Sequence, residues 1–215
     1  LELILDTIIN HLGEKGTFLL PVFNFDFCET NYFNYHETPS NMGSLTVVSL
    51  NNNNRFKRTK HPIYSFVVSG YFSKEFSSLN NKGGTSLSSP FALIHKLKGK
   101  IAAIDIPDQN CMTFYHYVED VHNVPYRYHK EFNGKYINED KQEINATYSL
   151  FDRDLDQGVE TFLSPAEKML WGRNLYSGDK PFSGAGIRSI GVETFFEFVS
   201  FIIENSAENV LYKKS

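Results

Sequence analysis

Several features that would assign this chain to a common class of protein are scarce or missing. Its 215 residues include only two cysteines, Cys28 and Cys111, which argues against a disulfide-stabilised secreted scaffold and for a reducing, cytoplasmic compartment. No apolar run reaches the roughly 18–20 residues of a membrane-spanning helix, and no signal peptide is recognisable. The net charge is −4 and no basic segment dominates, so neither a nucleic acid nor a membrane is expected as a partner.

Motifs of several large enzyme families are missing as well. The pair Gly83-Gly84 is not followed by the Lys-Ser/Thr of a phosphate-binding loop, no GxGxxG follows a strand, and no GxSxG is present. His116 and His122 are six residues apart, and no HxxxH or paired-cysteine spacing occurs. Because these spacings are what a zinc site requires, no metal cofactor is expected.

What the chain does contain is an alternation of helix-type and strand-type patterns. Apolar residues at helical spacing and capping residues predict helices over 1–12, 89–100, 164–175 and 192–212. Short apolar runs predict buried strands over 17–25, 63–72 and 101–107. Alternating polar and aromatic residues predict antiparallel strands within 128–160, and the polar, basic segment 51–62 predicts a surface loop. These patterns predict an α/β fold with a mixed sheet, formed by residues 1–215 as one domain.

The beginning of the printed sequence is unusual for such a fold. The helix predicted over 1–12 feeds directly into the strand over 17–25, and no strand comes before it. In α/β domains a helix of this kind usually follows a strand. We therefore expect the native protein to have a further segment before Leu1.

The densest set of titratable residues lies in 111–127, CMTFYHYVEDVHNVPYR, directly after an apolar strand. If 113–122 is helical, Thr113, His116 and Glu119 share one face, and the carboxylate can orient the imidazole. A histidine held by an acid in this way is a candidate general base. The alternative is an exposed ion pair with little energetic weight. A nucleophilic Cys111 is a further, weaker alternative, because a reactive cysteine needs a thiolate with a base in reach.

Five ordered segments resemble a known family. They are GTFLLPVFNFDF, TPSNMGSL, RTKHPIYSFVVSG, SPFALIHKLKGKIAAID and TFYHYVEDVHNVPYR. The chain resembles the aminoglycoside 3-N-acetyltransferase-like family over about residues 5–130, and more weakly through GAGIRSIGVETFFEFV. This resemblance implies a three-layer α/β/α fold, unlike that of the GNAT acetyltransferases. It also implies transfer of acetyl from acetyl-CoA, as co-substrate, to an amino group of a sugar-like acceptor.

The resemblance also implies roles for individual residues. The family's catalytic Thr-x-x-His-x-x-Glu motif falls on Thr113, His116 and Glu119. Segments expected near coenzyme A and the cleft contain Thr38, Ser40, Met42, His61 and Ser65, and for His61 a purely structural role is equally open. Family members also carry a strand and a His-Ser-Ser-Leu-like turn that helps to bind coenzyme A, and the printed sequence starts after that point.

The acceptor is harder to predict. Aminoglycosides are polycations and need an acidic pocket, but the acidic runs of this chain are dispersed over 119–120, 139–140 and 152–156. The last of them is interpreted as a solvated turn. The aromatic and basic segment 126–136, with Tyr126 and Arg127 as expected substrate contacts, suits a phosphate-bearing sugar. A nucleotide-linked amino sugar for surface polysaccharide is therefore narrowly preferred, with an aminoglycoside as the alternative. A catalytically silent sugar- or partner-binding relative stays open, as does a homo-oligomer.

Overall fold

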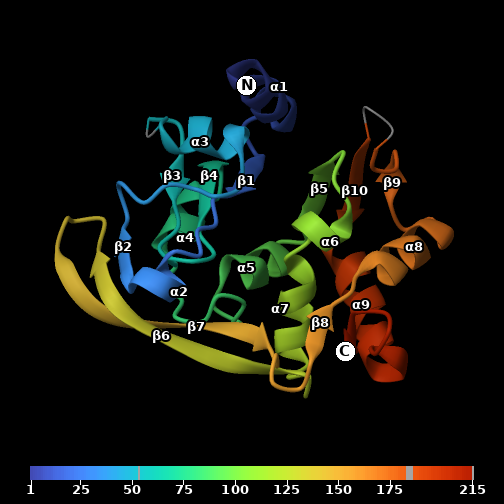
Figure 1. Cartoon of the computed structure of the whole chain (residues 1–215). Coiled ribbons are helices and arrows are strands. Elements are labelled where there is room, and N and C mark those ends of the chain that lie inside the picture. Colours follow the sequence, from blue (N-terminus) through green and yellow to red (C-terminus); the bar gives the residue numbers. More distant parts are fainter. Residues whose placement is uncertain (53, 183–185, 215) are drawn as a thin grey trace. The chain divides into compact units, whose positions relative to one another are not determined.

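The computed structural model describes residues 1–52, 54–182 and 186–214 (Figure 1). The chain divides into two compact units. Unit 1 contains residues 1–84, 88–90 and 130–150, and unit 2 contains residues 85–87, 91–129 and 151–215. Each unit combines segments that are distant in the sequence. That the two units form one domain stays a prediction. Asn53, in the segment predicted as a surface loop, and Gly184 and Ala185, in the last family-like segment, lie outside the described residues.

Unit 1 begins with helix α1 (Glu2–Leu12), as the sequence predicted. Strand β1 (Thr17–Pro21) follows, but it is shorter than the predicted 17–25 and half-buried rather than buried. Strand β1 pairs antiparallel with β4 (Phe66–Gly70), which also pairs antiparallel with the short β3 (Lys57–Arg58). The remaining elements of this part of the chain are α2 (Phe27–Thr30), β2 (Tyr32–Asn34), α3 (Ser44–Leu50) and α4 (Ser73–Ser78).

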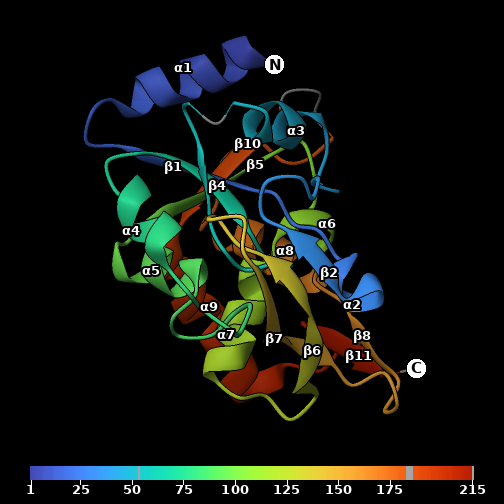
Figure 2. The same ribbon diagram turned by 90° about the vertical axis from the view of Figure 1, so that its left-hand side faces the viewer.

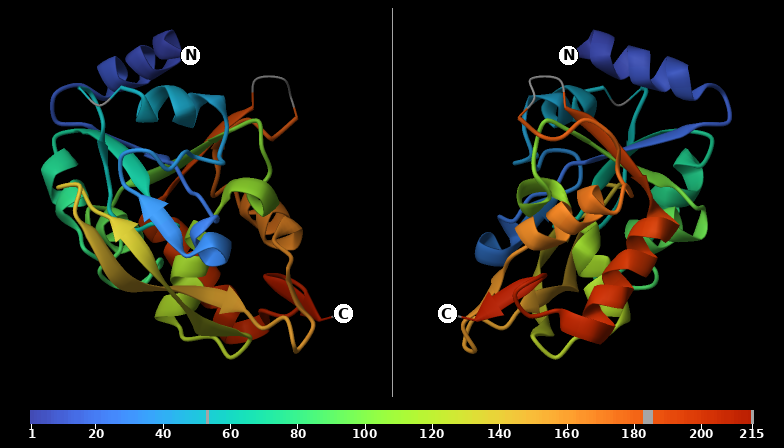
Figure 3. Two further views of the ribbon diagram at one scale, coloured as in Figure 1. Left: turned by 60° about the vertical axis from the view of Figure 1, so that its left-hand side comes forward. Right: turned by 90° about the vertical axis from the view of Figure 1, so that its right-hand side faces the viewer.

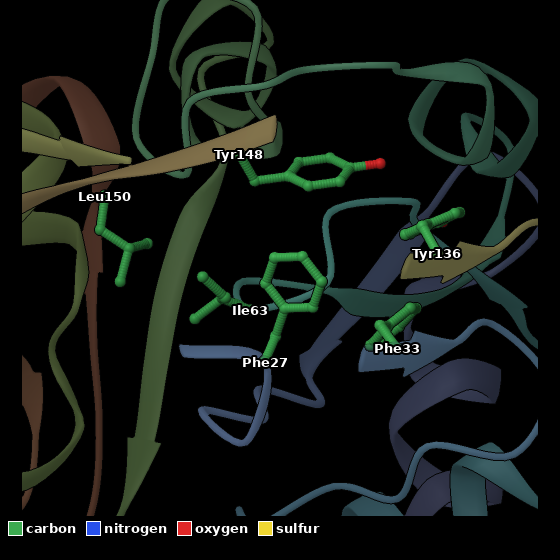
Figure 4. Packing of buried hydrophobic residues seen from close by; sticks show 6 residues of the cluster. All are labelled: Phe27, Phe33, Ile63, Tyr136, Tyr148 and Leu150. Atoms are coloured by element: carbon green, nitrogen blue, oxygen red, sulfur yellow. The ribbon is translucent and has the colours of Figure 1, made fainter. Parts of the chain in front are cut away.

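A long pair of strands contributes to both units. Strands β6 (Arg127–Ile137) and β7 (Glu143–Arg153) confirm the strands predicted within 128–160, and β6 also pairs with β2 in parallel (Figure 2). Their unit 1 portions close an aromatic core (Figure 4). There the rings of Phe27 and Tyr148 meet edge to face, with centroids 5.8 Å apart, and Phe33 stacks on Tyr136 at 5.3 Å.

Unit 2 carries a three-stranded antiparallel sheet in the order β5 (Lys100–Ile104), β10 (Ile187–Gly191), β9 (Ser177–Gly178). A second pair joins β8 (Val159–Thr161) to β11 (Tyr212–Lys214). The helices are α5 (Pro90–Lys96), α6 (Asp108–Cys111), α7 (Phe114–Val121), α8 (Ser164–Gly172) and α9 (Val192–Ser206).

Helix α9 lies beside α7 (Figures 1 and 3). The apolar face of α9 supports α7 through Phe195, whose ring meets the rings of Phe114 and Tyr115 at centroid distances of 5.9 and 4.7 Å. Both α7 rings and Phe195 are buried. The 3.6-residue spacing of apolar residues in α9 therefore fixes one side of the helix that carries the predicted catalytic residues.

Three further local predictions need correction. The last helix ends at Ser206 rather than 212, because the chain turns there into β11. The strand over 101–107 is only partly buried, since β5 is the outer strand of its sheet and Ile104 is 52% exposed. The segment 51–62 is not simply a surface loop, because β3 pairs with β4 and the side chains of Arg58 and His61 are buried.

The α/β class with open sheets is confirmed. No helix of the described residues is both long enough and apolar enough to span a bilayer.

Candidate active site

Helix α7 brings together two of the predicted catalytic residues, His116 and Glu119. His116 and Glu119 are separated by one turn, and His116 Nδ1 lies 2.8 Å from Glu119 Oε2. The Glu119 side chain is completely buried, whereas the His116 side chain retains 19% exposure. The exposed-pair alternative does not fit this geometry, because a buried carboxylate holds one side of the ring and solvent still reaches the histidine.

Two residues from the start of β6 and the turn before it hold the Glu119 carboxylate. Arg127 Nε lies 2.8 Å from Oε2, and the Tyr126 hydroxyl donates a hydrogen bond to Oε1 at 3.0 Å. Burial alone would raise the pKa of Glu119. The Arg127 charge and the hydrogen bonds from His116 and Tyr126 outweigh this effect and lower the pKa of the carboxyl overall. Glu119 is therefore an ionised, immobile acceptor.

Arg127 is itself fixed by neutral partners. Its Nη1 donates to the carbonyl oxygen of Phe151 and its Nη2 to the hydroxyl of Thr161, each at 3.2 Å. Tyr126 and Arg127 are 4% and 8% exposed. The structure thus shows both predicted substrate contacts engaged with Glu119 in the interior, and contact with a substrate stays a prediction.

The electrostatic environment makes His116 a base rather than a permanent cation. Burial lowers the pKa of His116, the Arg127 charge lowers it further, and the Glu119 and Asp152 carboxylates oppose this only in part. Because Glu119 is an acceptor, we assign the hydrogen to Nδ1, which leaves the lone pair of Nε2 available for a proton. A neutral imidazole with a fixed tautomer is what general-base catalysis requires.

The beginning of α7 is anchored by a buried network. The Tyr115 hydroxyl donates to Asp108 Oδ2 at 2.9 Å, and Arg188 Nη2 of β10 donates to Asp108 Oδ1 at 2.7 Å. Tyr176 donates to the same carboxylate at 2.7 Å. Because Tyr115 directly precedes His116, this network fixes the first turn of the helix, from which the histidine projects.

Thr113 lies immediately before α7. Its carbonyl oxygen accepts the His116 N–H at 2.9 Å, and its side chain is half-buried. Within the described residues its hydroxyl has no hydrogen-bond partner, so the group is available to a ligand. Its predicted catalytic role stays a prediction.

Cys111 does not have the environment of a nucleophile. Its thiol donates to the carbonyl oxygen of Pro107 at 3.3 Å, and burial raises the pKa of the thiol to about 11. A thiol with this pKa is protonated near neutral pH, and a thiolate is the reactive form. The geometry therefore does not favour an acyl-cysteine.

The residues expected near coenzyme A lie in unit 1 and have different environments. Thr38 and Ser40 line a hollow of about 580 Å³, and Met42 is 38% exposed. His61 and Ser65 are completely buried. These positions stay predictions for coenzyme binding, and two of them have no exposed surface.

His61 has a clear structural role. Its Nδ1 accepts the backbone N–H groups of Ile63 and Tyr64 at 3.2 and 3.0 Å, which closes the turn before β4. Burial lowers the pKa of the ring to about 3, so it is neutral at neutral pH. The purely structural role that the sequence left open is the one this geometry favours.

Sequence reasoning missed Asp152. The acidic run over 152–156 was expected to be a turn, which is correct for Asp154, whose carboxylate accepts the backbone N–H of Gln157 at 3.1 Å. Asp152 instead belongs to the end of β7, and its charge acts on His116. A signal was present, because the strand pattern extends into the first residue of the run. Within the described residues, no group of three His, Cys, Asp or Glu side chains is arranged to hold a metal ion.

Comparisons with known proteins give the family of the chain and its fold. A family model described as aminoglycoside 3-N-acetyltransferase matches residues 2–181. A comparison with curated protein sequences gave no match.

Three solved structures share the fold. Aminoglycoside acetyltransferase AAC(3)-Xa is 16% identical with a TM-score of 0.76, covering 94% of this chain and 80% of its own. Sisomicin-bound AAC-VIa is 19% identical with a TM-score of 0.70, covering 94% and 83%. AAC-IIIb in a binary complex with CoASH is 15% identical with a TM-score of 0.69, covering 89% and 78%.

Proposed function

The chain belongs to the aminoglycoside 3-N-acetyltransferase family, and from this premise we propose that it acetylates an amino group of an aminoglycoside with acetyl-CoA as the donor. The observation that carries the proposal is the His116–Glu119 pair, with a buried carboxylate holding a neutral, solvent-reachable imidazole. The nucleotide-linked sugar preferred from the sequence finds no support, and the aminoglycoside alternative fits the family match and the fold comparisons better.

In the proposed reaction, the acceptor ammonium first loses one proton to the solvent. His116 Nε2 then removes a second proton from the neutral amine as its nitrogen attacks the thioester carbonyl. A tetrahedral intermediate forms with a new C–N bond, and its oxyanion needs hydrogen-bond donors. The free hydroxyl of Thr113 is one candidate for that role. The C–S bond then breaks, and the imidazolium returns its proton to the departing coenzyme A thiolate. No covalent enzyme intermediate is needed.

Glu119 has two roles in this scheme. It keeps the hydrogen of His116 on Nδ1 by accepting it at 2.8 Å, and its negative charge stabilises the transient imidazolium. Tyr126 and Arg127 prevent the carboxylate from rotating, because they occupy both of its oxygens. They act as positioning residues in the proposed reaction.

Asp152 supports a cationic acceptor. Its charge acts on His116 from the end of β7, and the side chain is only half-buried. A carboxylate beside the base can attract and hold an ammonium group of the substrate. We expect Asp152→Asn to raise the KM for gentamicin about fivefold, which corresponds to about 1 kcal/mol, with a smaller effect on kcat. The matched control is Asp156→Asn, which neutralises an exposed residue of the following turn.

The test of the function is a thiol-release assay on the full-length protein with acetyl-CoA. Gentamicin and kanamycin should support turnover, while UDP- and dTDP-linked amino sugars should not. His116→Ala should lower kcat at least ~100-fold, the usual range for loss of a general base. His11→Ala, at an exposed position of α1, should retain activity.

Two outcomes would contradict the proposal. Turnover only with nucleotide sugars would overturn the acceptor. If the folded protein releases no thiol with any of the amines, the hypothesis of a catalytically silent relative would be favoured over that of an enzyme.

A further inference from the structure

Unit 1 contains a hollow that has no part in the proton transfers proposed above, although Thr38 and Ser40 of its lining are among the residues predicted to lie near coenzyme A. It has a volume of about 580 Å³, within the usual range for small-molecule sites. Its lining comes from the segment 35–40, helix α3, strand β3, the end of α4 and Glu139 near the end of β6. All of these residues belong to unit 1.

The hollow is lined by a buried arginine without a counter-charge. Arg58 is 6% exposed, yet its hydrogen bonds go only to neutral groups, and no described carboxylate forms an ion pair with it. Nη1 donates to the carbonyl oxygens of Tyr35 and Thr38 at 3.2 and 2.7 Å, and Nε and Nη2 donate to Ser65 Oγ at 3.3 Å. These four bonds leave one of the five N–H donors unused.

Burying the positive charge of Arg58 without an anion beside it costs free energy. A buried cation is normally paired with an anion, because neutral acceptors replace only part of its hydration. Burial lowers the pKa of Arg58 to about 10, as expected for a charge that lacks a partner. The face of the Phe33 ring, 4.8 Å from the guanidinium carbon, compensates only weakly.

Other lining groups are suited to an anion. Lys57 is exposed and forms no ion pair within the described residues, whereas Lys60 is paired with Glu139. The Thr38 hydroxyl accepts the backbone N–H of Asn34 at 2.8 Å, which leaves its own hydrogen free to donate. The remaining acid of the lining is Glu37, which already accepts a hydrogen bond from Asn34.

We propose that this hollow binds the phosphate group of a small molecule, with Arg58 as the buried counter-charge and Lys57 and Thr38 as further contacts. A planar guanidinium that keeps a free N–H, next to an ammonium and a hydroxyl, matches a phosphate better than an uncharged ligand. The lining of the hollow carries three basic side chains (Lys57, Arg58 and Lys60) and two acidic ones (Glu37 and Glu139). This excess of positive charge disfavours a polycation as the ligand of the hollow. The inference does not depend on the proposed acetyl transfer.

The test is a titration of the ¹⁵N-labelled full-length protein with inorganic phosphate, followed by NMR. We expect saturable shifts of the backbone amides of Thr38, Ser40 and Lys57. Lys57→Gln should weaken binding about three- to tenfold, as expected for loss of one charged contact. Lys74→Gln, an exposed change on α4 outside the hollow, should leave the affinity unaltered.

Arg58→Gln should abolish the saturable shifts, and thermal unfolding of the free variant shows whether it folds. If this variant does not fold, the comparison of Lys57→Gln with Lys74→Gln still decides whether phosphate binds in the hollow. Absence of saturable shifts in the unaltered protein would overturn the proposal. So would equal phosphate affinity in the two lysine variants, because that would indicate a nonspecific charge effect.

A second arm identifies the source of the phosphate. If coenzyme A displaces inorganic phosphate and shifts the same amides while dephospho-coenzyme A does not, the bound group is the 3′-phosphate of the coenzyme. If coenzyme A shifts other amides and phosphate remains bound, the hollow takes the phosphate of a different molecule.

Discussion

Arg127 should set the pH range in which the proposed base works. Its Nε and the Nδ1 of His116 each lie 2.8 Å from the same oxygen of Glu119, so these nitrogens are at most about 5.6 Å apart. Two unit charges at that distance repel by about 3 kcal/mol at an effective dielectric constant near 20. Because His116 is partly exposed and the solvent screens the charge, we take about half of this value.

The predicted perturbation is Arg127→Met, which removes the charge and keeps much of the side-chain volume. Without the guanidinium, the pKa values of His116 and Glu119 should both rise, so the pair keeps a proton up to higher pH. On the acidic side of the pH profile, kcat/KM should therefore fall about tenfold, which corresponds to about 1.4 kcal/mol. Above the acidic limb, where His116 is neutral in both proteins, only the loss of the contact that positions Glu119 remains, so the difference in rate should be smaller than on the acidic side.

The assay is the pH dependence of kcat/KM with gentamicin and acetyl-CoA. Arg127→Lys is the control, because it retains a positive charge beside Glu119 while losing the bonds to Phe151 and Thr161. Thermal unfolding of each variant separates loss of structure from loss of charge. If folded Arg127→Met has an unchanged acidic limb, the electrostatic reasoning is wrong.

Two further predictions concern other titratable groups. His61→Asn can still accept the N–H groups of Ile63 and Tyr64, but it removes a ring whose pKa is lowered to about 3. As the pH falls from about 6.5 towards 3, only the unfolded chain gains this proton, so the parent should lose up to about 1.4 kcal/mol of unfolding free energy per pH unit relative to the variant. Urea unfolding across this window measures the difference, and parallel curves would refute it. Cys111→Ala should change kcat less than twofold in the thiol-release assay, because the half-buried thiol, with its pKa raised to about 11, stays protonated; an inactive, folded variant would instead indicate an acyl-cysteine.

The sequence predicted most secondary structure well where the signal was local. Helical spacing located α1 and α7, capping residues located α5 and α8, and short apolar runs located β1, β4 and β5. Predictions failed where tertiary contacts decide the outcome. The polar segment 51–62 contains the buried Arg58 because β3 pairs with β4, and composition alone carries no information about that pairing.

For the candidate site, the sequence by itself determined that His116 and Glu119 face each other, because residues three apart on a helix are neighbours whatever surrounds them. Only the tertiary structure decided that Glu119 is buried, that Tyr126 and Arg127 hold its two oxygens, and that Asp152 acts on His116. Those groups come from β6, the turn before it and the end of β7. Their distances depend on how separate elements pack, and with them the pKa of the base.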